Sequence, residues 1–199
     1  MQPIPKLIIL GRDGILNEFR EDHIKASEEW VAVPGALEAV SRLNHAGWHV
    51  VVATNQSGIG RGMIDMASVN AVHAHMMRSL QTLGGRIDAV FFCPHTPEDG
   101  CDCRKPLPGM ALDIGRRYGA DLAMVPMVGD TLRDLQAAQA AGCEPHLVRS
   151  GRAAALDAGQ VADMVRQVPG TVVHRDLADL ATHMLEREHV RDSQSGTLP

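Results

Sequence analysis

Three cysteines and one histidine lie close together in the middle of the chain, and these residue types bind metal ions. They are Cys93, His95, Cys101 and Cys103, in the pattern Cys-x-His and then Cys-x-Cys. Three thiolates and one imidazole are a ligand set of tetrahedral structural zinc. A Cys101–Cys103 disulfide would close a very small, strained loop and is not expected. We therefore predict a zinc ion that staples this loop, and an inert buried thiol at Cys143, away from the cluster.

A carboxylate and a helix-start signal follow the apolar run at 124–128. Asp130 comes at the end of this run. At such a strand tip a carboxylate suits a hard cation such as Mg²⁺, so Asp130 is a candidate metal ligand. Thr131 and Asp134 have the spacing of a capping box, so Asp134 is foremost a residue that begins a helix, and a direct role in the site is the less favoured reading.

Two other segments could bind phosphate. The run Thr54-Asn55-Gln56-Ser57-Gly58 offers a hydroxyl, two amides and a flexible turn, which can donate hydrogen bonds to phosphate oxygens. The same residues are also ordinary in turns, so alone they are a weak signal. Lys105 could neutralise phosphate charge as a point cation, or it could be a solvated surface lysine.

The elements that must position these residues alternate along the chain. Short apolar runs alternate with amphipathic stretches, which favours βαβ units, an α/β fold and a mainly parallel sheet. The predicted strands are 6–10, 48–53, 87–92, 124–128, 145–149 and 171–174. The predicted helices are 34–47, 64–83, 109–118, 131–141 and 177–188. One domain is expected over 1–188, without a separate cap domain, followed by a polar, disordered tail over 189–199.

The polar clusters share one place in this plan. Segments 11–17, 54–58, 93–105 and 129–134 each follow an apolar strand directly. Ligands bind beyond the carboxyl ends of strands in parallel sheets. We therefore expect the four segments to meet at one site, although any α/β protein has polar loops after its strands.

Composition limits the partners. The net charge of -5 and a pI near 6.0 give no reason to expect nucleic acid. No apolar run approaches the length of a membrane span, and the first residues lack the features of a signal peptide. The clustered cysteines are typical of metal binding rather than of a secreted disulfide framework. We expect a cytoplasmic monomer that does not bind membranes.

Taken together, these segments resemble the haloacid-dehalogenase-like (HAD) phosphatases over nearly the whole chain. The segment Gly11-Arg12-Asp13-Gly14-Ile15-Leu16-Asn17 resembles their opening signature, Asp-x-Asp-Gly-x-x-Asn. The Thr-Asn-Gln-Ser-Gly run, the Cys/His loop and Cys-Arg-Lys-Pro-x-Pro-Gly-Met resemble the zinc-loop branch of that superfamily. Members of this branch remove phosphate from heptose 1,7-bisphosphate, in lipopolysaccharide-core synthesis, or from histidinol phosphate. A chain without a fused dehydratase favours the heptose substrate.

The resemblance implies a role for each matching position. An aspartate at position 11 would attack phosphorus, and Asp13 would act as general acid and base. Magnesium would be held by the carboxylate at 11, the backbone carbonyl of Asp13 and Asp130. The resemblance implies that the phosphosugar substrate is bound by Thr54, Asn55, Gln56, Arg104 and Lys105.

Gly11 departs from this pattern, because it removes the nucleophile and one metal ligand at once. Loss of a nucleophile can lower turnover by about a million-fold. Asp13 could still activate water for slow, direct hydrolysis. Three readings stay open: an inactivated phosphatase, a pseudoenzyme that binds a phosphosugar or a partner protein, or a chain that retains activity by another route or carries a sequence error.

Overall fold

Strand β1 (Leu7–Leu10) lies in the middle of the sheet and is buried on both faces. Ile8 and Leu10 belong to one apolar cluster, and Leu7 and Ile9 belong to the cluster on the opposite face. Successive side chains of a strand point to opposite faces, so a strand covered on both sides is a continuous apolar run.

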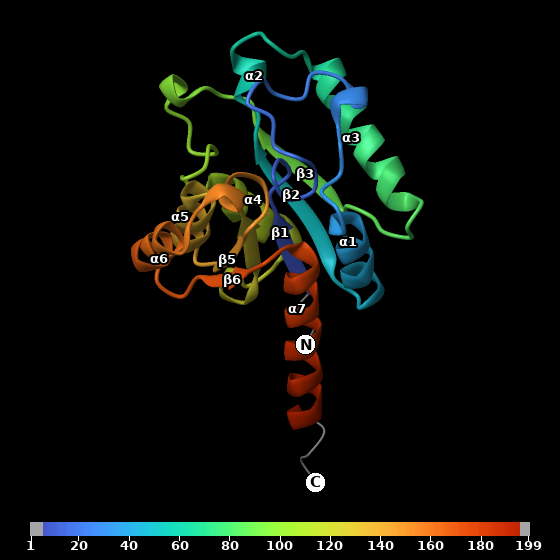
Figure 1. Ribbon diagram of the computed structural model, residues 1–199, viewed down its shortest axis with the longest axis vertical. Helices are drawn as coiled ribbons and strands as arrows, with labels where there is room; N and C mark the ends of the chain where they lie inside the picture. The colour runs from blue at the N-terminus through green and yellow to red at the C-terminus, as the bar shows by residue number, and fades with distance from the viewer. Residues whose placement is uncertain (1–5, 196–199) are drawn as a thin grey trace.

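The computed structural model describes residues 6–195, within which six strands pair in parallel in the order β3-β2-β1-β4-β5-β6 (Figure 1). After β1 the strands are β2 (His49–Asn55), β3 (Ala89–Cys93), β4 (Pro126–Gly129), β5 (Glu144–Val148) and β6 (Val172–His174). The order reverses direction at β1, whose neighbours are β2 and β4. Loops that leave β1 and β4 therefore diverge and open a crevice at this switch point.

Helices cover both faces of the sheet. The helices are α1 (Ala36–His45), α2 (Ser57–Gly60), α3 (Met66–Gln81), α4 (Gly109–Tyr118), α5 (Leu132–Ala141), α6 (Ala158–Gln167) and α7 (Leu177–Ser195). Helices α1, α3 and α7 contribute to the apolar cluster on one face, and α4, α5 and α6 pack on the other (Figure 1). The result is a three-layer α/β fold, as the sequence predicts.

The predicted elements are present, with ends shifted by a few residues. The helix predicted at 109–118 has those bounds. Helix α6 was not predicted, although Asp157 and Gln160 form a capping box at its start. Helix α7 continues to Ser195, so the polar segment 189–195 is helical and differs from the disordered tail expected there. Residues 196–199 of that predicted tail lie outside the described residues. Among the described helices, none is both long and apolar enough to cross a membrane.

Candidate active site

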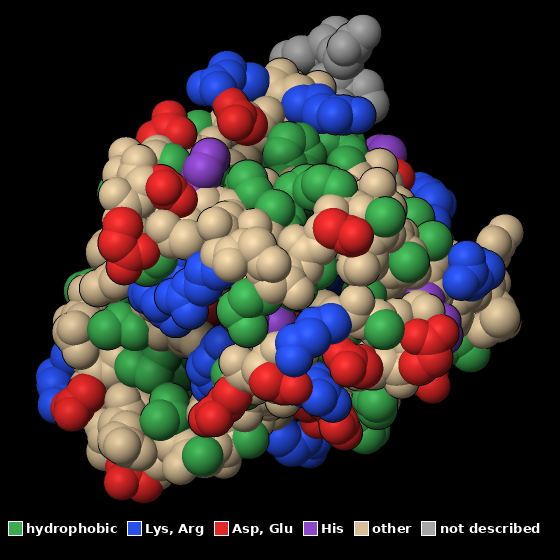
Figure 2. Space-filling view, turned by 90° about the horizontal axis from the view of Figure 1, so that it is seen from above, with side chains coloured by type: hydrophobic (Ala, Val, Ile, Leu, Met, Phe, Trp, Pro, Cys, Tyr) green, Lys and Arg blue, Asp and Glu red, His purple; other side chains and the backbone are tan. Residues whose placement is uncertain are grey.

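A cavity of about 190 Å³ opens at the carboxyl ends of β1, β2 and β4. Its lining includes residues of all four polar segments that the sequence analysis expects to meet, among them Gly11, Thr54, Lys105 and Asp130. Seen from above, Lys and Arg side chains gather on this face around a hollow (Figure 2). The structure therefore brings the predicted site residues together at the switch point of the sheet.

Gly11 lines this cavity at the point where β1 ends. Its backbone N–H donates to the carbonyl oxygen of Val128 at 2.9 Å, so position 11 continues the pairing of β1 with β4. A Cβ atom at this position would lie 3.0 Å from Cγ1 of Ile15 and 3.5 Å from the Val128 oxygen, and its φ is not in the left-handed region. A side chain here needs a shift of Ile15 by a few tenths of an ångström, and the backbone conformation does not demand glycine.

Asp13 faces the same cavity and is held by the side chain beside it. The Arg12 guanidinium is 2% exposed, and its Nη2 donates to both carboxylate oxygens of Asp13, at 2.9 and 3.2 Å. Burial opposes the negative charge of Asp13, but the charge of Arg12 and hydrogen bonds from Asn17, Arg12 and Gln56 outweigh it and lower the pKa of Asp13. Asp13 is therefore a carboxylate at neutral pH, ready to accept a proton.

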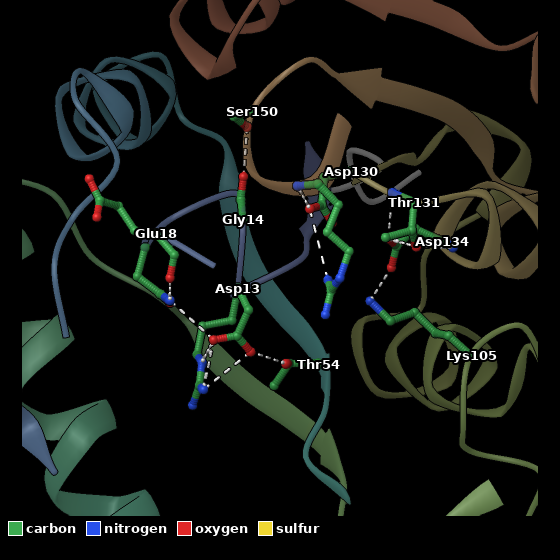
Figure 3. Close-up of polar contacts among 12 residues, drawn as sticks. Asp13, Gly14, Glu18, Thr54, Lys105, Asp130, Thr131, Asp134 and Ser150 are labelled. Carbon is green, nitrogen blue, oxygen red and sulfur yellow. Dashed lines mark hydrogen bonds and ion pairs between the residues drawn. The ribbon is translucent and has the colours of Figure 1, made fainter. Parts of the chain in front are cut away.

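Three further polar groups orient the Asp13 carboxylate (Figure 3). Asn17 donates from Nδ2 to Oδ1 at 3.1 Å, and Gln56 donates from Nε2 to Oδ2 at 2.9 Å. The hydroxyl of Thr54 approaches Oδ2 at 3.4 Å and accepts from Gln56 at 2.9 Å. Gln56, predicted as a substrate-binding residue, is 2% exposed, so its amide positions Asp13 and Thr54.

Asn55 and Lys105 are joined through their amide groups. The Asn55 side chain donates to the carbonyl oxygen of Lys105 at 3.0 Å and accepts from its N–H at 3.1 Å. Both ends of the amide are thus engaged, and Asn55 fixes the backbone of Lys105. Its predicted contact with phosphate would depend on the remaining Nδ2 hydrogen.

Lys105 is 6% exposed, so the alternative of a solvated surface lysine does not apply. Its Nζ lies 2.5 Å from Oδ1 of Asp134 and donates to the carbonyl oxygen of Ala53 at 2.9 Å. Asp134 also forms the predicted capping box with Thr131 at the start of α5 (Figure 3). Asp134 therefore both begins the helix and holds the lysine ammonium at the cavity wall.

Asp130 lies opposite Asp13 at the end of β4, and it is 3% exposed. Burial and the neighbouring charge of Asp134 raise the pKa of Asp130 to about 6. The backbone N–H of Arg152 donates to its Oδ2 at 2.7 Å. A buried carboxylate with one oxygen left without a hydrogen bond among the described residues is a suitable donor for a hard cation.

Two glycines make room for Asp130. A Cβ atom on Gly14 or Gly151 would overlap Oδ2 of Asp130, and both residues have positive φ angles. Ser150 donates to the carbonyl oxygen of Gly14 at 2.6 Å and ties the two turns together (Figure 3). The segment 150–152, which the sequence analysis did not single out, therefore positions Asp130.

The Cys/His cluster lies beside the cavity. Ligand atoms of Cys93, His95, Cys101 and Cys103 all lie within 4.8 Å of one another. Cys101 Sγ is 3.6 Å from Cys93 Sγ and 3.5 Å from Cys103 Sγ, and all three thiols are free of disulfides. Tetrahedral zinc with sulfur ligands at about 2.3 Å requires sulfur–sulfur separations of roughly 3.7 Å. The four groups fit a structural zinc site with Nδ1 as the ligand atom of His95.

The zinc loop leads directly into the cavity wall. Arg104 follows Cys103, lines the cavity, and donates to the carbonyl oxygen of His95 at 3.1 Å. Lys105 comes next and is held by Asn55 as described above. Cys143 is 6% exposed and lies in the apolar cluster that also contains Leu7 and Ile9, which agrees with the prediction of a buried thiol.

Comparison with known proteins identifies the relatives of this arrangement. The HAD-hydrolase-like family profile matches residues 102–180, and the polynucleotide kinase 3 phosphatase profile matches residues 13–138. The D-glycero-beta-D-manno-heptose-1,7-bisphosphate 7-phosphatase of Bordetella bronchiseptica is 53% identical over 91% of this chain and 98% of its own length. That of Pseudomonas aeruginosa is 45% identical over 90% of this chain and 98% of its own length. This chain belongs to the HAD-like phosphatase family of the D,D-heptose 1,7-bisphosphate phosphatases.

Solved structures of the family agree with the fold. The D,D-heptose 1,7-bisphosphate phosphatase of B. bronchiseptica, in complex with magnesium and phosphate, superposes with a TM-score of 0.85. It is 52% identical and covers 92% of this chain and 99% of its own. The enzyme of Burkholderia thailandensis superposes with a TM-score of 0.69 at 48% identity, over 90% of this chain and 98% of its own.

Two contributors to this phosphatase-family site were missed by sequence reasoning. His73 on α3 contacts Arg12, and Arg152 lines the cavity from η4 (Gly151–Ala155), the short 3-10 helix after β5. Neither residue carries a local pattern, because each reaches the site through a contact between distant segments. Gly14 and Gly151 were detectable in principle, because they follow the predicted strands 6–10 and 145–149 by four and two residues.

Proposed function

We propose that this chain binds D-glycero-D-manno-heptose 1,7-bisphosphate and that Gly11 reduces its hydrolysis of the 7-phosphate to a slow reaction. The relatives named above carry this activity in their names and match over nearly their whole length. Every other polar group expected of the site lines or supports one cavity, and this single observation carries the proposal. By the family resemblance, the reaction belongs to lipopolysaccharide-core heptose synthesis.

The cavity wall formed by Thr54 and Lys105 would bind the phosphate that is to be removed. The Lys105 ammonium is fixed by Asp134 and Ala53, so it meets the ligand without a change of rotamer. Arg104 would bind elsewhere on the phosphosugar, because its guanidinium is anchored at the rim of the zinc loop. A fixed cation next to a hydroxyl donor stabilises negative charge as it develops on phosphate oxygens.

Asp130 and the backbone carbonyl of Asp13 would hold a magnesium ion. These donors suit the ion, because Asp130 is buried beside the cavity and Arg152 donates to only one of its carboxylate oxygens. When bound, Mg²⁺ would supply charge stabilisation to the phosphoryl group. Position 11 offers no carboxylate to it, so we expect weaker magnesium binding than in a chain with aspartate there.

Asp13 would move the protons of the slow reaction. As an ionised carboxylate it accepts a proton from a water molecule while the water oxygen bonds to phosphorus. The bond between phosphorus and the sugar oxygen breaks, and Asp13 returns the proton to that oxygen. The products are the sugar alcohol and inorganic phosphate, and no covalent enzyme intermediate forms because Gly11 cannot attack.

Binding without turnover is the second candidate function, and the glycine at the nucleophile position specifically favours it. All the groups proposed to bind phosphate are present, so affinity should survive where chemistry fails. We infer a cytoplasmic location, because the three thiols of the zinc cluster must be reduced to bind the metal. A monomer remains our expectation.

Phosphate release from heptose 1,7-bisphosphate in the presence of MgCl₂ tests the proposal. The chain is compared with Gly11→Asp and, as a control of similar size without a carboxylate, Gly11→Asn. We expect strong activity from Gly11→Asp alone and a slow rate above background from the unchanged chain. Activity of neither chain on this sugar, with turnover of histidinol phosphate by Gly11→Asp, would reassign the substrate. A rate for the unchanged chain equal to the protein-free background would leave binding as its function.

A further inference from the structure

Arg152 places an uncommitted guanidinium at the mouth of the cavity. Its backbone N–H is used by Asp130, but its side chain donates no hydrogen bond to any residue within 6–195. Nη1 lies 3.9 Å from Oδ2 of Asp130, close enough for an ion pair and too far for a hydrogen bond. The side chain is 41% exposed, so its planar fork of five donors faces the open part of the cavity.

The guanidinium is nevertheless held in place. Its Cζ lies 3.5 Å from the centre of the Phe19 ring, which comes from the loop after β1 and also lines the cavity. An arginine stacked on an aromatic face loses little further freedom when it binds a ligand, because the ring already restricts its plane. The turn that carries Arg152 is fixed in turn by the bond from Ser150 to Gly14.

Arg133 also lines the cavity without a hydrogen bond or ion pair among residues 6–195, but it is exposed and does not stack on an aromatic ring there. Four other cations of the cavity are committed to protein partners. Arg12 donates to Asp13 and contacts His73, Lys105 pairs with Asp134, and Arg104 donates to the backbone. Arg20 pairs with Asp22. Arg152 thus combines a fixed position with unused donors, a combination that suits a doubly charged oxyanion, which accepts two parallel N–H bonds.

We propose that Arg152, held on the face of Phe19, is a further binding residue that takes a phosphate group of the ligand. The inference rests on the proposed function for the identity of the phosphosugar. The chemistry of recognition is that of phosphate itself, whether it is the group to be removed or the second phosphate of the same sugar.

Equilibrium binding to the full-length chain tests this inference directly, since Gly11 keeps the ligand from rapid hydrolysis. Calorimetry would measure the Kd of heptose 1,7-bisphosphate and of inorganic phosphate, with and without MgCl₂, for Arg152→Gln and Arg152→Lys. Both substitutions retain the backbone N–H that Asp130 accepts. Arg117→Gln is the matched control, because Arg117 lies over the Phe91 ring at 5.8 Å, and neither residue lines the cavity.

We expect Arg152→Gln to weaken bisphosphate binding about 10- to 100-fold, from the loss of charge-assisted hydrogen bonds. Arg152→Lys should fall between this variant and the unchanged chain, and Arg117→Gln should bind like the unchanged chain. Equal weakening for inorganic phosphate places Arg152 at the phosphate that both ligands share, and weakening for the bisphosphate alone places it at the second phosphate.

The two proposals can fail separately. Bisphosphate binding by Arg152→Gln within twofold of the unchanged chain, or equal weakening by Arg117→Gln, overturns the role of Arg152 and leaves the proposed function intact. Binding of inorganic phosphate that depends on Arg152, without binding of the heptose bisphosphate, overturns the substrate and supports Arg152. A chain that binds neither ligand overturns both. Circular dichroism of each variant checks that it is folded.

Discussion

His73 accepts a hydrogen bond from Arg12, with Nε2 and Nη1 lying 3.1 Å apart in the interior. Burial, and then the charge of Arg12, lower the pKa of His73 to about 4, so the ring is neutral at pH 7 and Nε2 is free to accept. Arg12 in turn donates from its other edge to Asp13. A histidine on α3 therefore sets the orientation of a carboxylate at the end of β1, through one buried guanidinium.

We expect His73→Leu to disturb this chain of contacts and His73→Gln to preserve much of it. Leucine leaves Nη1 of Arg12 buried without an acceptor, which costs about 1–3 kcal/mol, whereas a glutamine carbonyl can accept. Urea unfolding measures the loss of stability. In a Gly11→Asp background, His73→Leu should lower kcat more than it changes KM. His75→Leu, two residues along the same helix, is the control, and an equal fall in kcat there would contradict the relay.

The buried Lys105–Asp134 pair should be far more sensitive than a surface pair. Their side chains are 8% and 9% exposed, so Lys105→Met leaves Asp134 as an uncompensated buried charge. We expect a loss of about 3–5 kcal/mol in the free energy of unfolding. Lys25→Met breaks an exposed pair with Asp22 and should change it by less than about 1 kcal/mol. Urea titrations of both variants measure the free energy of unfolding. A loss for Lys105→Met as small as that for Lys25→Met would mean that solvent screens the Lys105–Asp134 pair.

One zinc ion per chain should bind and stabilise the folded state. Native mass spectrometry is expected to show one zinc ion per chain, lost in Cys101→Ser and retained in Cys143→Ser. Chelation should lower the Tm by about 5–10 °C, given that 1 kcal/mol shifts the Tm of a chain of this size by about 2–4 °C. It should also weaken phosphate binding, because Arg104 and Lys105 directly follow the ligand Cys103. A metal-free mass with all thiols reduced would rule the site out.

Stability should fall in mild acid because of a histidine cluster formed by β5, β6 and α7. His174 Nε2 lies 2.9 Å from His146 Nδ1, and the His183 ring stands 5.2 Å from that of His174. Burial, then the charges of His146 and His183, lower the pKa of His174 to about 4, against the opposing charge of Asp179. Other charged groups facing the cluster are Glu144 on β5 and Arg187 on α7.

The direction in which stability changes with pH follows from the pKa of His174 in the unfolded and folded chains. Its pKa is about 6.5 in the unfolded chain and about 4 in the folded one, so between these values the unfolded state binds the extra proton. Stability is complete above pH 6.5 and declines as the pH falls toward 4, by on the order of 1–3 kcal/mol. His174→Gln should flatten this slope in urea titrations, and His189→Gln, an exposed histidine of α7, should leave it unchanged. An unaltered slope in His174→Gln would assign the acid sensitivity to other groups.

The sequence predicted the buried strands, the meeting of the polar segments and the zinc ligands, because each of these depends on residues close together in the chain. Buried strands such as β1 are continuous apolar runs, and the polar segments after them meet because all carboxyl ends of a parallel sheet share one edge. The ligand set of the zinc loop was likewise complete in the sequence. Helix α6 was missed although its sequence carries both local signals, a capping box and apolar residues at helical spacing, Val161, Met164 and Val165.

The missing parts of the site depend on contacts between distant segments. Gln56 and Asn55 were predicted to donate to phosphate. The sequence could not show that their side-chain amides instead donate to Asp13 and to the backbone of Lys105. It could not bring His73 to Arg12, or Arg152 to Phe19, since each pair joins different layers or loops. Such pairings follow from the tertiary fold, which determines which of several possible partners a polar side chain meets.

The backbone at Gly11 could carry a side chain, and the absence of one changes how the occupancy of the site depends on the ligand. An active phosphatase depletes the phosphosugar that it binds. A site that hydrolyses it as slowly as we propose would come close to equilibrium with it, so its occupancy would follow the free concentration of the phosphosugar. Ligand bound to the folded state alone stabilises it by RT ln(1 + [L]/Kd), about 2.7 kcal/mol at a hundred times Kd. The stability of the folded chain would then rise with the concentration of the phosphosugar.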